Sequence, residues 1–394
     1  MNILITTIFE YPHEGGLSTH VTTLMKGLQE RGHQVDVLSF TDMNPVTRKL
    51  FTQAPGYLIN KVKKGKGQLL NDRQKMKMLK SYIEKVKGKY DLINSQDIYA
   101  ALASIESGIP TVATVHGYFS YEAISRGAVI QGSPEELEII ETEKKAYQQA
   151  TSVIAVDQRI KEYIKRQADV EAYSIKNFIN VHEFKVDRSK AEQIKTEFEI
   201  PKDVQVLFVP RRLTEKNGVI YPTLALPKVL EKHPNTLLVY AGTGEQYTNI
   251  EQTAYKLGIQ DKVRLLGSVP HEKMKELYSI ADIVLVPSIH SHGVEEATSI
   301  SALEAMGSGA PVIAGAVGGL KEIFEHEKDG LLVEEKNTED LSQSIIRILD
   351  DGSLGETLSK NARKKVEEHY SHIAAAEKYE TIYKEALSLK QHNL

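Results

Sequence analysis

Short runs of β-branched and aliphatic residues alternate with longer amphipathic stretches along almost the whole chain. The apolar runs are nearly continuous, which is typical of strands that are buried on both faces of a parallel sheet. Such runs predict strands at 2–7, 34–40, 92–95, 111–116, 151–156, 204–210, 236–242, 262–267, 282–288 and 311–316. Between them, helical periodicity predicts helices over 17–31, 72–88, 135–149, 219–232, 271–280 and 338–350.

Two such series of strands and helices predict the α/β class, with two doubly wound, Rossmann-like domains. We expect the domains to span 1–180 and 181–370. The last helix, at about 371–394, has an apolar stripe, so we expect it to pack back on the first domain. Open α/β sheets bind ligands at the carboxyl ends of their strands, which predicts a site in a cleft between the two facing domains.

Composition narrows the class of protein. The 394 residues exceed the usual size of one core, and 41% apolar with 26% charged residues is typical of a globular chain. The absence of cysteine excludes disulfides, thiolate metal sites and thiol catalysis. A net charge of −4 argues against nucleic acid as the main partner. The opening MNILITTIFEYP indicates a strand rather than a signal peptide, so we expect a cytoplasmic protein, with the inner face of the membrane as an alternative location.

One segment departs from this acidic balance. Residues 61–89 contain eleven Lys or Arg against Asp72 and Glu84. Two interpretations remain open: a solvated helix face, or attraction to an anionic membrane surface or a phosphate-bearing acceptor.

Two groups of residues in the N-terminal half follow or end predicted strands and are candidates for ligand contacts. Gly15 and Gly16 precede a helix, where backbone amides can approach an anion, although a plain glycine turn explains them equally well. They are not the dinucleotide fingerprint, because no further glycine follows until Gly27. His116 ends a strand, as Asp97 does with weaker support, so it is either a ligand contact or a hydrogen-bonded structural residue.

The second half carries a cationic loop. Arg211, Arg212 and Lys216 follow the first strand of that half and precede a helix, which favours an anion site over surface salt bridges. It is not a P-loop. Gly242 lies in another strand–turn–helix connection, and the loop at Val269 is placed to touch a nucleotide base.

The segment GVEEATSISALEAMGSGAPVIA, 293–314, predicts a helix from about Ser299 to Ser308, capped by Thr298 or Ser299. Its first amides, near Ser299 and Ile300, can hold a phosphate. Glu296 and Glu304 lie on either side of this helix start, and both carboxylates can accept hydrogen bonds from sugar hydroxyls. The alternative is a pair of solvated glutamates.

The order and spacing of these motifs resemble the retaining glycosyltransferases of family 4, which have the GT-B fold. The resemblance includes VHG at 115–117, RLTEKNG at 212–218, AGTG at 241–244, E-x7-E-A-M from Glu296, and GGLKEI at 318–323. It covers nearly the whole chain. It implies transfer of a sugar from a nucleotide-diphosphate donor, which we expect to be UDP-linked, to an acceptor hydroxyl.

The resemblance also implies residue roles. His116 and Glu296 would lie beside the donor sugar, Glu304 would bind the ribose, and the amide of Gly16 would approach the diphosphate. Arg212 or Arg211, with Lys216, would neutralise the diphosphate. Family members usually have Gly-Arg-Leu where this chain has Pro210-Arg211-Arg212-Leu213, which leaves the choice of arginine open.

The chain has no D-x-D motif, so we expect no metal and no other cofactor. The resemblance implies front-face displacement, in which the leaving diphosphate helps to deprotonate the acceptor. Two other functions remain open: a nucleotide-sugar epimerase, and a non-catalytic nucleotide-sugar-binding subunit. The loops at 41–75 and 117–133 are expected to select the acceptor.

Overall fold

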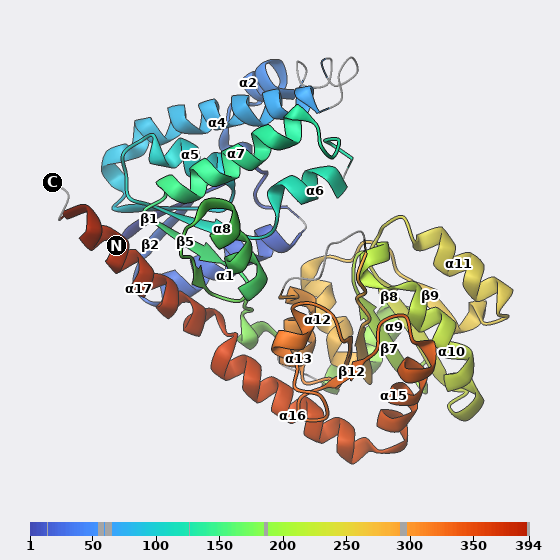
Figure 1. Ribbon diagram of the computed structural model, residues 1–394. Coiled ribbons are helices and arrows are strands. Elements are labelled where there is room, and N and C mark those ends of the chain that lie inside the picture. The colour runs from blue at the N-terminus through green and yellow to red at the C-terminus, as the bar shows by residue number, and fades with distance from the viewer. Residues whose placement is uncertain are drawn as a thin grey trace. The chain divides into compact units, whose positions relative to one another are not determined.

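Two six-stranded parallel sheets organise the chain (Figure 1). The computed structural model describes residues 1–13, 15–53, 59, 65–125, 127–184, 188–291 and 298–391. The chain divides into two compact units, Met1–Asn177 with His372–Leu394, and Phe178–Ser371. We call them the first and second unit. Each sheet is covered by helices on both faces, which confirms the predicted α/β class and its doubly wound architecture.

The first unit has the strand order β2-β1-β3-β4-β5-β6. Its strands are β1 (Asn2–Thr6), β2 (Gln34–Leu38), β3 (Leu92–Ser95), β4 (Thr111–Val115), β5 (Ser152–Ala155) and β6 (Tyr173–Ser174). Its helices are α1 (Gly16–Glu30), α2 (Pro45–Arg48), α4 (Lys66–Val86), α5 (Ile98–Ile105), α6 (Phe119–Ser125), α7 (Pro134–Gln149), α8 (Gln158–Ala168) and α17 (His372–Gln391), with a π-helical turn at Lys49–Gln53. Figure 1 shows α4, α5 and α7 on one face of the sheet, and α1 with α17 on the other.

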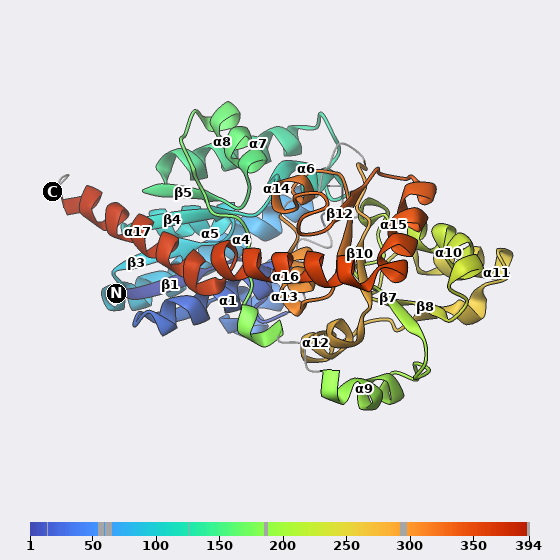
Figure 2. The same ribbon diagram turned by 90° about the horizontal axis from the view of Figure 1, so that it is seen from below.

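The last helix belongs to the first unit although it ends the chain. Figure 2 shows α17 running alongside α1. A side chain at Gly27 of α1 would meet the carbonyl oxygen of His372 at 2.6 Å. The missing side chain therefore permits the close approach of these two helices.

The second unit has the strand order β12-β11-β10-β7-β8-β9. Its strands are β7 (Gln205–Pro210), β8 (Thr236–Ala241), β9 (Val263–Leu265), β10 (Ile283–Val286), β11 (Val312–Gly315) and β12 (Leu331–Val333). Its helices are α9 (Ala191–Glu197), α10 (Ile220–Lys232), α11 (Tyr247–Lys256), α12 (His271–Ile280), α13 (Ile300–Ser308), α14 (Leu320–Ile323), α15 (Thr338–Asp350) and α16 (Gly352–His369).

Strand β7 shows why the apolar runs are continuous. Val206 and Phe208 join the core beneath α12, α13 and α16, whereas Leu207 and Val209 join the core beneath α10 and α15. Successive side chains point to opposite faces, and both faces are covered, so every position from Val206 to Pro210 is apolar.

The structure adds elements that periodicity did not predict. They include α5, α8 and the three-residue strand β12, with the short elements α2, α6, α14 and β6. Helix α5, with the sequence IYAALASI, is buried over nearly its whole length, so it has no polar face to set a helical period. The helix expected from residue 72 begins at Lys66.

The basic segment is mostly helix α4, and residues 61–64 lie outside the described residues. Two cations on α4 are paired within the unit, Arg73 with Glu138 and Lys80 with Glu106. Within the described ranges, no helix is long and apolar enough to cross a membrane.

Candidate functional site

In the second unit, Arg211 lies at the start of helix α13. Its Nη1 donates to Ser299 Oγ across 3.4 Å, and its Nη2 donates to Asn217 Oδ1 across 2.8 Å. Ser299 is the N-cap of α13, and its hydroxyl accepts from the Ala302 amide at 3.4 Å. The guanidinium is buried and held at two points, so its position is fixed without a ligand.

This arrangement favours an anion. The first N–H groups of a helix have no acceptor within the helix, and its dipole is positive at that end. A buried guanidinium beside them adds a full charge with planar donors, which suits phosphate oxygens. The start of α13 therefore combines the donors and the charge that suit a phosphate group.

The structure separates the two arginines that the sequence left equivalent. Arg212 is exposed, and its carbonyl oxygen accepts from Asn217 Nδ2 at 2.8 Å. Lys216 is half-buried in the turn Glu215–Asn217. Among the described residues, no hydrogen bond or ion pair joins the side chain of either cation to α13. Within the part of the chain that the structure describes, Arg211 is the one of the three whose side chain is hydrogen-bonded to the helix start.

The glycines of the AGTG motif are explained by the chain's own packing. A side chain at Gly242 would meet the carbonyl oxygen of Arg211 at 2.0 Å, and one at Gly244 would meet that of Leu213 at 2.3 Å. Gly242 also has φ of 150°, which disfavours other residues. These glycines let the β8 loop pack against the loop that carries Arg211, and a donor contact at Gly242 stays a prediction.

Glu304 is buried on α13 beside two ring side chains. Tyr278 donates its hydroxyl to Glu304 Oε2 across 3.0 Å, and His271 Nδ1 lies 4.0 Å from Oε1. Burial raises the pKa of Glu304 to about 7, although the Tyr278 hydrogen bond and the charge of Lys275 oppose this shift. The carboxylate therefore changes charge near neutral pH, and a ligand hydroxyl that donates to it would favour the ionised form.

The other predicted contacts of the second unit lie around this helix start. Thr298 and Ser299 are buried immediately before α13. Ile300, on α13, and Val269, in the loop after β9, are both half-buried. Both pack against the hydrophobic core that α13 covers. Glu296 lies outside the described residues, so its role stays a prediction.

In the first unit, His116 follows strand β4 and is half-buried. Its Nε2 lies 2.8 Å from Gln96 Oε1, and its ring meets that of His20 edge-on, with 4.6 Å between ring centroids. Burial, and then the neighbouring His20, lowers the pKa of His116 well below its ordinary value. Burial lowers the pKa of His20 to about 4. Both rings are therefore neutral at pH 7.

A chain of amides selects the tautomer of His116. Asn94 Nδ2 donates to the backbone carbonyl of Val112 at 3.0 Å, so Asn94 Oδ1 is left to accept from Gln96 Nε2. Gln96 Oε1 then faces His116, whose Nε2 must carry the proton. The other nitrogen, Nδ1, is left as a hydrogen-bond acceptor.

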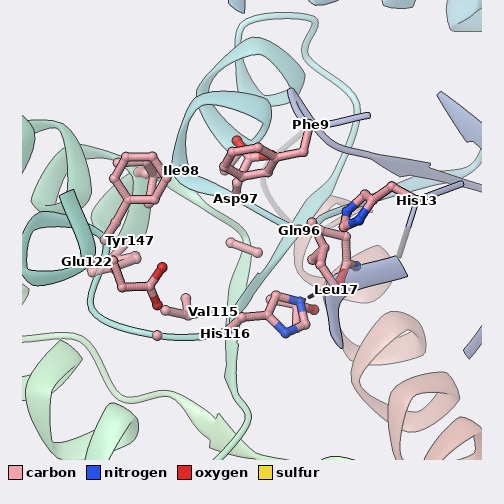
Figure 3. Close-up of a pocket in the computed structure, with 16 residues that line it drawn as sticks. Phe9, His13, Leu17, Gln96, Asp97, Ile98, Val115, His116, Glu122 and Tyr147 are labelled. Carbon is pink, nitrogen blue, oxygen red and sulfur yellow. Dashed lines mark hydrogen bonds between the residues drawn. The ribbon is translucent and has the colours of Figure 1, made fainter. Parts of the chain in front are cut away.

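A cavity of about 240 Å³ lies beside His116 in the first unit (Figure 3). Figure 3 shows Phe9, Ile98 and Tyr147 on its walls, and the Glu122 carboxylate extended toward the space beside His116. Gly16, the first residue of α1, is exposed, and the next residue, Leu17, lines the cavity.

Asp97 lines this cavity, but both of its carboxylate oxygens accept hydrogen bonds from the first unit itself. It caps α5 through the Ala100 amide at 2.8 Å. Its other oxygen accepts from the Thr7 hydroxyl at 2.9 Å and the Ile8 amide at 2.8 Å. Asp97 is therefore a structural residue.

Sequence reasoning did not find Asn94, Gln96, Tyr278 or His271. Gln96 offered one signal, since it comes directly after β3, where an α/β protein presents ligand-contacting groups. Tyr278 offered no signal, because the sequence pattern places its ring on the apolar face of α12.

Across the described ranges, no group of three or more His, Asp or Glu residues is placed to hold a metal ion.

Comparison with known proteins identifies the family. Residues 14–183 match the model of Glycosyltransferase Family 4, and residues 190–365 match that of Glycosyl transferases group 1. An uncharacterized glycosyltransferase of Methanocaldococcus jannaschii is 31% identical, over 99% of each chain. The N-acetyl-α-D-glucosaminyl L-malate synthase of Bacillus anthracis is 25% identical, over 96% of each.

Solved structures share the fold. Sucrose-phosphate synthase of Thermosynechococcus elongatus aligns with a TM-score of 0.74 at 21% identity, over 98% of this chain and 99% of that one. HepE of Anabaena, solved in complex with UDP-glucose, aligns with a TM-score of 0.71 at 20% identity over all of both chains.

Proposed function

The chain belongs to the glycosyltransferases of family 4, with the GT-B fold, and we propose that it is a retaining enzyme that uses a UDP-linked sugar without a metal. The observation that carries this proposal is the contact between Arg211 and Ser299 at the start of α13. It supplies a fixed positive site for the diphosphate, which is the group that gains negative charge during transfer.

The donor would lie along α13. The diphosphate would occupy the site at Arg211, and the ribose hydroxyls would donate to Glu304, four residues into the helix from Ile300. Val269 and Ile300 would border the base, and Lys216 and Gly16 would add to the diphosphate site. HepE, which shares the fold, is solved with UDP and with UDP-glucose, which supports a donor of this class.

In the proposed reaction, the bond between the anomeric carbon and the β-phosphate oxygen breaks, and its electron pair stays on the diphosphate. The acceptor oxygen forms the new bond to the same face of the sugar, and its proton passes to the departing diphosphate. Arg211 would stabilise the charge on the leaving group as it forms. Glu296 and the Nδ1 acceptor of His116 would hold hydroxyl groups of the sugar or the acceptor, which fixes their orientation.

The experiment is a donor screen in buffer that contains EDTA. UDP-, GDP- and ADP-sugars are offered with a panel of alcohols, and release of nucleoside diphosphate is measured together with the anomeric configuration of the product. We expect release from UDP-sugars and an α-linked product from an α-linked donor. Release that depends on added metal, or an inverted product, would overturn the corresponding part of the proposal.

Three further expectations stay predictions: a cleft shared by both units, membrane contact through residues 61–89, and a cytoplasmic location. The exposed lysines of α4 support membrane contact, whereas the pairing of Arg73 and Lys80 limits the charge available for it.

A further inference from the structure

The cavity beside His116 has walls that are mainly apolar. Phe9, Ile98, Phe119, Ala146 and Tyr147 contribute rings and aliphatic carbon from four different segments of the first unit. A cavity of about 150 Å³ with such walls accepts benzene, and drug-sized ligands usually need more than about 300 Å³. At about 240 Å³, this cavity suits one ring or one short alkyl group.

The polar groups deepest in this cavity already form hydrogen bonds within the protein. Both oxygens of Asp97 accept hydrogen bonds from the first unit, and the Tyr147 hydroxyl donates to Glu143. Gln96 is held between Asn94 and His116. A polar ligand group that entered deeply would lose water without gaining partners, so the inner part favours apolar groups.

A second hollow, of about 340 Å³, adjoins the first, since Phe9 and His13 line both. Its other walls include Lys75 and Asn71, one turn apart on the same face of α4. The Lys75 ammonium lies 4.7 Å from the centroid of the Phe40 ring. Burial raises the pKa of Asp97, and the charge of Lys75 opposes this shift, which places Lys75 near the cavity beside His116.

Lys75 gives this second hollow the charge of an anion site. Asn71 Oδ1 is buried and has no hydrogen-bond partner among the described residues, and as an amide oxygen it can only accept, so it suits a ligand hydroxyl. The acidic side chain of the hollow, Glu10, is paired with Arg48 at 2.8 Å. The charge of Lys75 is therefore not neutralised by Glu10, and Asn71 Oδ1 beside it can accept a hydrogen bond from a ligand hydroxyl.

We propose that the acceptor is a small anionic alcohol that places a ring or short alkyl group in the cavity beside His116 and an anionic group next to Lys75. This inference rests on the proposed glycosyl transfer, and it names the class of acceptor. The hydroxyl that receives the sugar lies near His116 and directs its proton to the departing diphosphate, while Nδ1 can accept a hydrogen bond from a neighbouring hydroxyl of the sugar or the acceptor.

The test uses phenyl phosphate as the probe, with inorganic phosphate and phenol as its two halves. Dissociation constants are measured by ligand-observed NMR with UDP present, and again in Arg211→Gln protein, so that phosphate binding at α13 does not contribute. We expect phenyl phosphate to bind at least about tenfold more tightly than either half, because the apolar and charged contacts add. Equal affinity for phenyl phosphate and inorganic phosphate would overturn the proposal.

Two kinds of variant locate the binding. Lys75→Gln should weaken the binding of phenyl phosphate about tenfold and leave the binding of phenol unchanged, whereas Lys77→Gln, at an exposed lysine on the same helix, should change neither. Ala101→Leu and Ala146→Leu, which each fill the cavity from a different helix, should weaken both aromatic probes. Unchanged binding in Lys75→Gln and in both filled variants would overturn the proposal.

The outcome is separable from that of the proposed function. UDP binding and release of UDP from a donor report on the second unit, and they need no phenyl phosphate. Loss of UDP binding with intact phenyl phosphate binding would count against the donor site alone, and the reverse would count against the acceptor class alone.

Discussion

Gln96 Oε1 lies 2.8 Å from His116 Nε2, and this hydrogen bond decides which nitrogen of the histidine carries a proton. The amide of Gln96 is itself oriented by Asn94, which donates to the backbone carbonyl of Val112. Because a backbone carbonyl can only accept, the direction of the whole chain of hydrogen bonds is fixed. His116, which burial keeps neutral, is thereby held with Nδ1 as an acceptor at the edge of the cavity in the first unit.

Gln96→Met should test this positioning role. Methionine has a similar size but cannot fix the tautomer, so we expect kcat to fall about tenfold with little change in the KM for the donor. The ¹⁵N shifts of His116 should report one tautomer in the wild type and a mixture in the variant. Gln149→Met, at an exposed glutamine of the same unit, is the control. An unchanged tautomer in Gln96→Met would refute the role.

Glu304→Gln should change how stability depends on pH. The folded pKa of about 7 exceeds the ordinary 4.5, so the folded protein holds its proton more tightly than the unfolded chain does. The stability that this carboxyl contributes is complete below pH 4.5 and is lost as pH rises through 7. The free energy of unfolding of Glu304→Gln, relative to that of the wild type, should therefore be higher at pH 8 than at pH 5. The difference between the two pH values should be at most about 3 kcal/mol.

Urea unfolding at the two pH values measures the difference in the free energy of unfolding between Glu304→Gln and the wild type. A difference that is equal at pH 5 and pH 8 would show that the pKa of Glu304 is close to its ordinary value.

The ribose role of Glu304 is tested by pairing a variant with a modified ligand. The wild type should bind UDP about tenfold more tightly than 2′,3′-dideoxy-UDP, because only UDP offers hydroxyls to the carboxylate. Glu304→Ala should bind the two nucleotides with equal affinity. If the variant still prefers UDP as strongly as the wild type does, another group binds the ribose.

Gly242→Ala should destabilise the second unit. The new methyl group would meet the carbonyl oxygen of Arg211 at 2.0 Å, and the backbone φ of 150° is unfavourable for alanine. We expect a loss of more than about 2 kcal/mol in the free energy of unfolding. Gly352→Ala is the matched control, since a methyl group there meets nothing within 4 Å, and it should be neutral or slightly stabilising. Equal stabilities of the two variants would contradict this explanation of the glycine.

Much of the fold could be predicted because its strands are buried on both sides. The apolar runs at β7 and β10, for example, lie within two residues of the predicted bounds. Helix α5 could not be predicted in this way, since a helix that is buried all round lacks polar positions that mark its period. Strand β12 is too short for its pattern to be distinguished from a loop.

The candidate site divides along a similar line. Arg211, Glu304 and His116 could be proposed because each stands at a strand end or helix start, where local sequence shows the chemistry. The choice of Arg211 over Arg212 needed the structure, because it depends on a contact with Ser299, 88 residues away. The hydrogen bond between Gln96 and His116 joins the ends of two neighbouring strands, β3 and β4. It could not be predicted, because neither segment of sequence shows which strands are neighbours in the sheet.

The central claim is that the start of α13 holds the diphosphate of a nucleotide sugar through Arg211. Titration calorimetry with UDP in EDTA tests it directly, in the wild type, in Arg211→Gln and in Arg347→Gln, an exposed arginine elsewhere in the second unit. We predict that the wild type and Arg347→Gln bind UDP with the same affinity, and that Arg211→Gln binds it at least about tenfold more weakly. Failure of the wild type to bind UDP, or equal affinity in Arg211→Gln, would contradict the account.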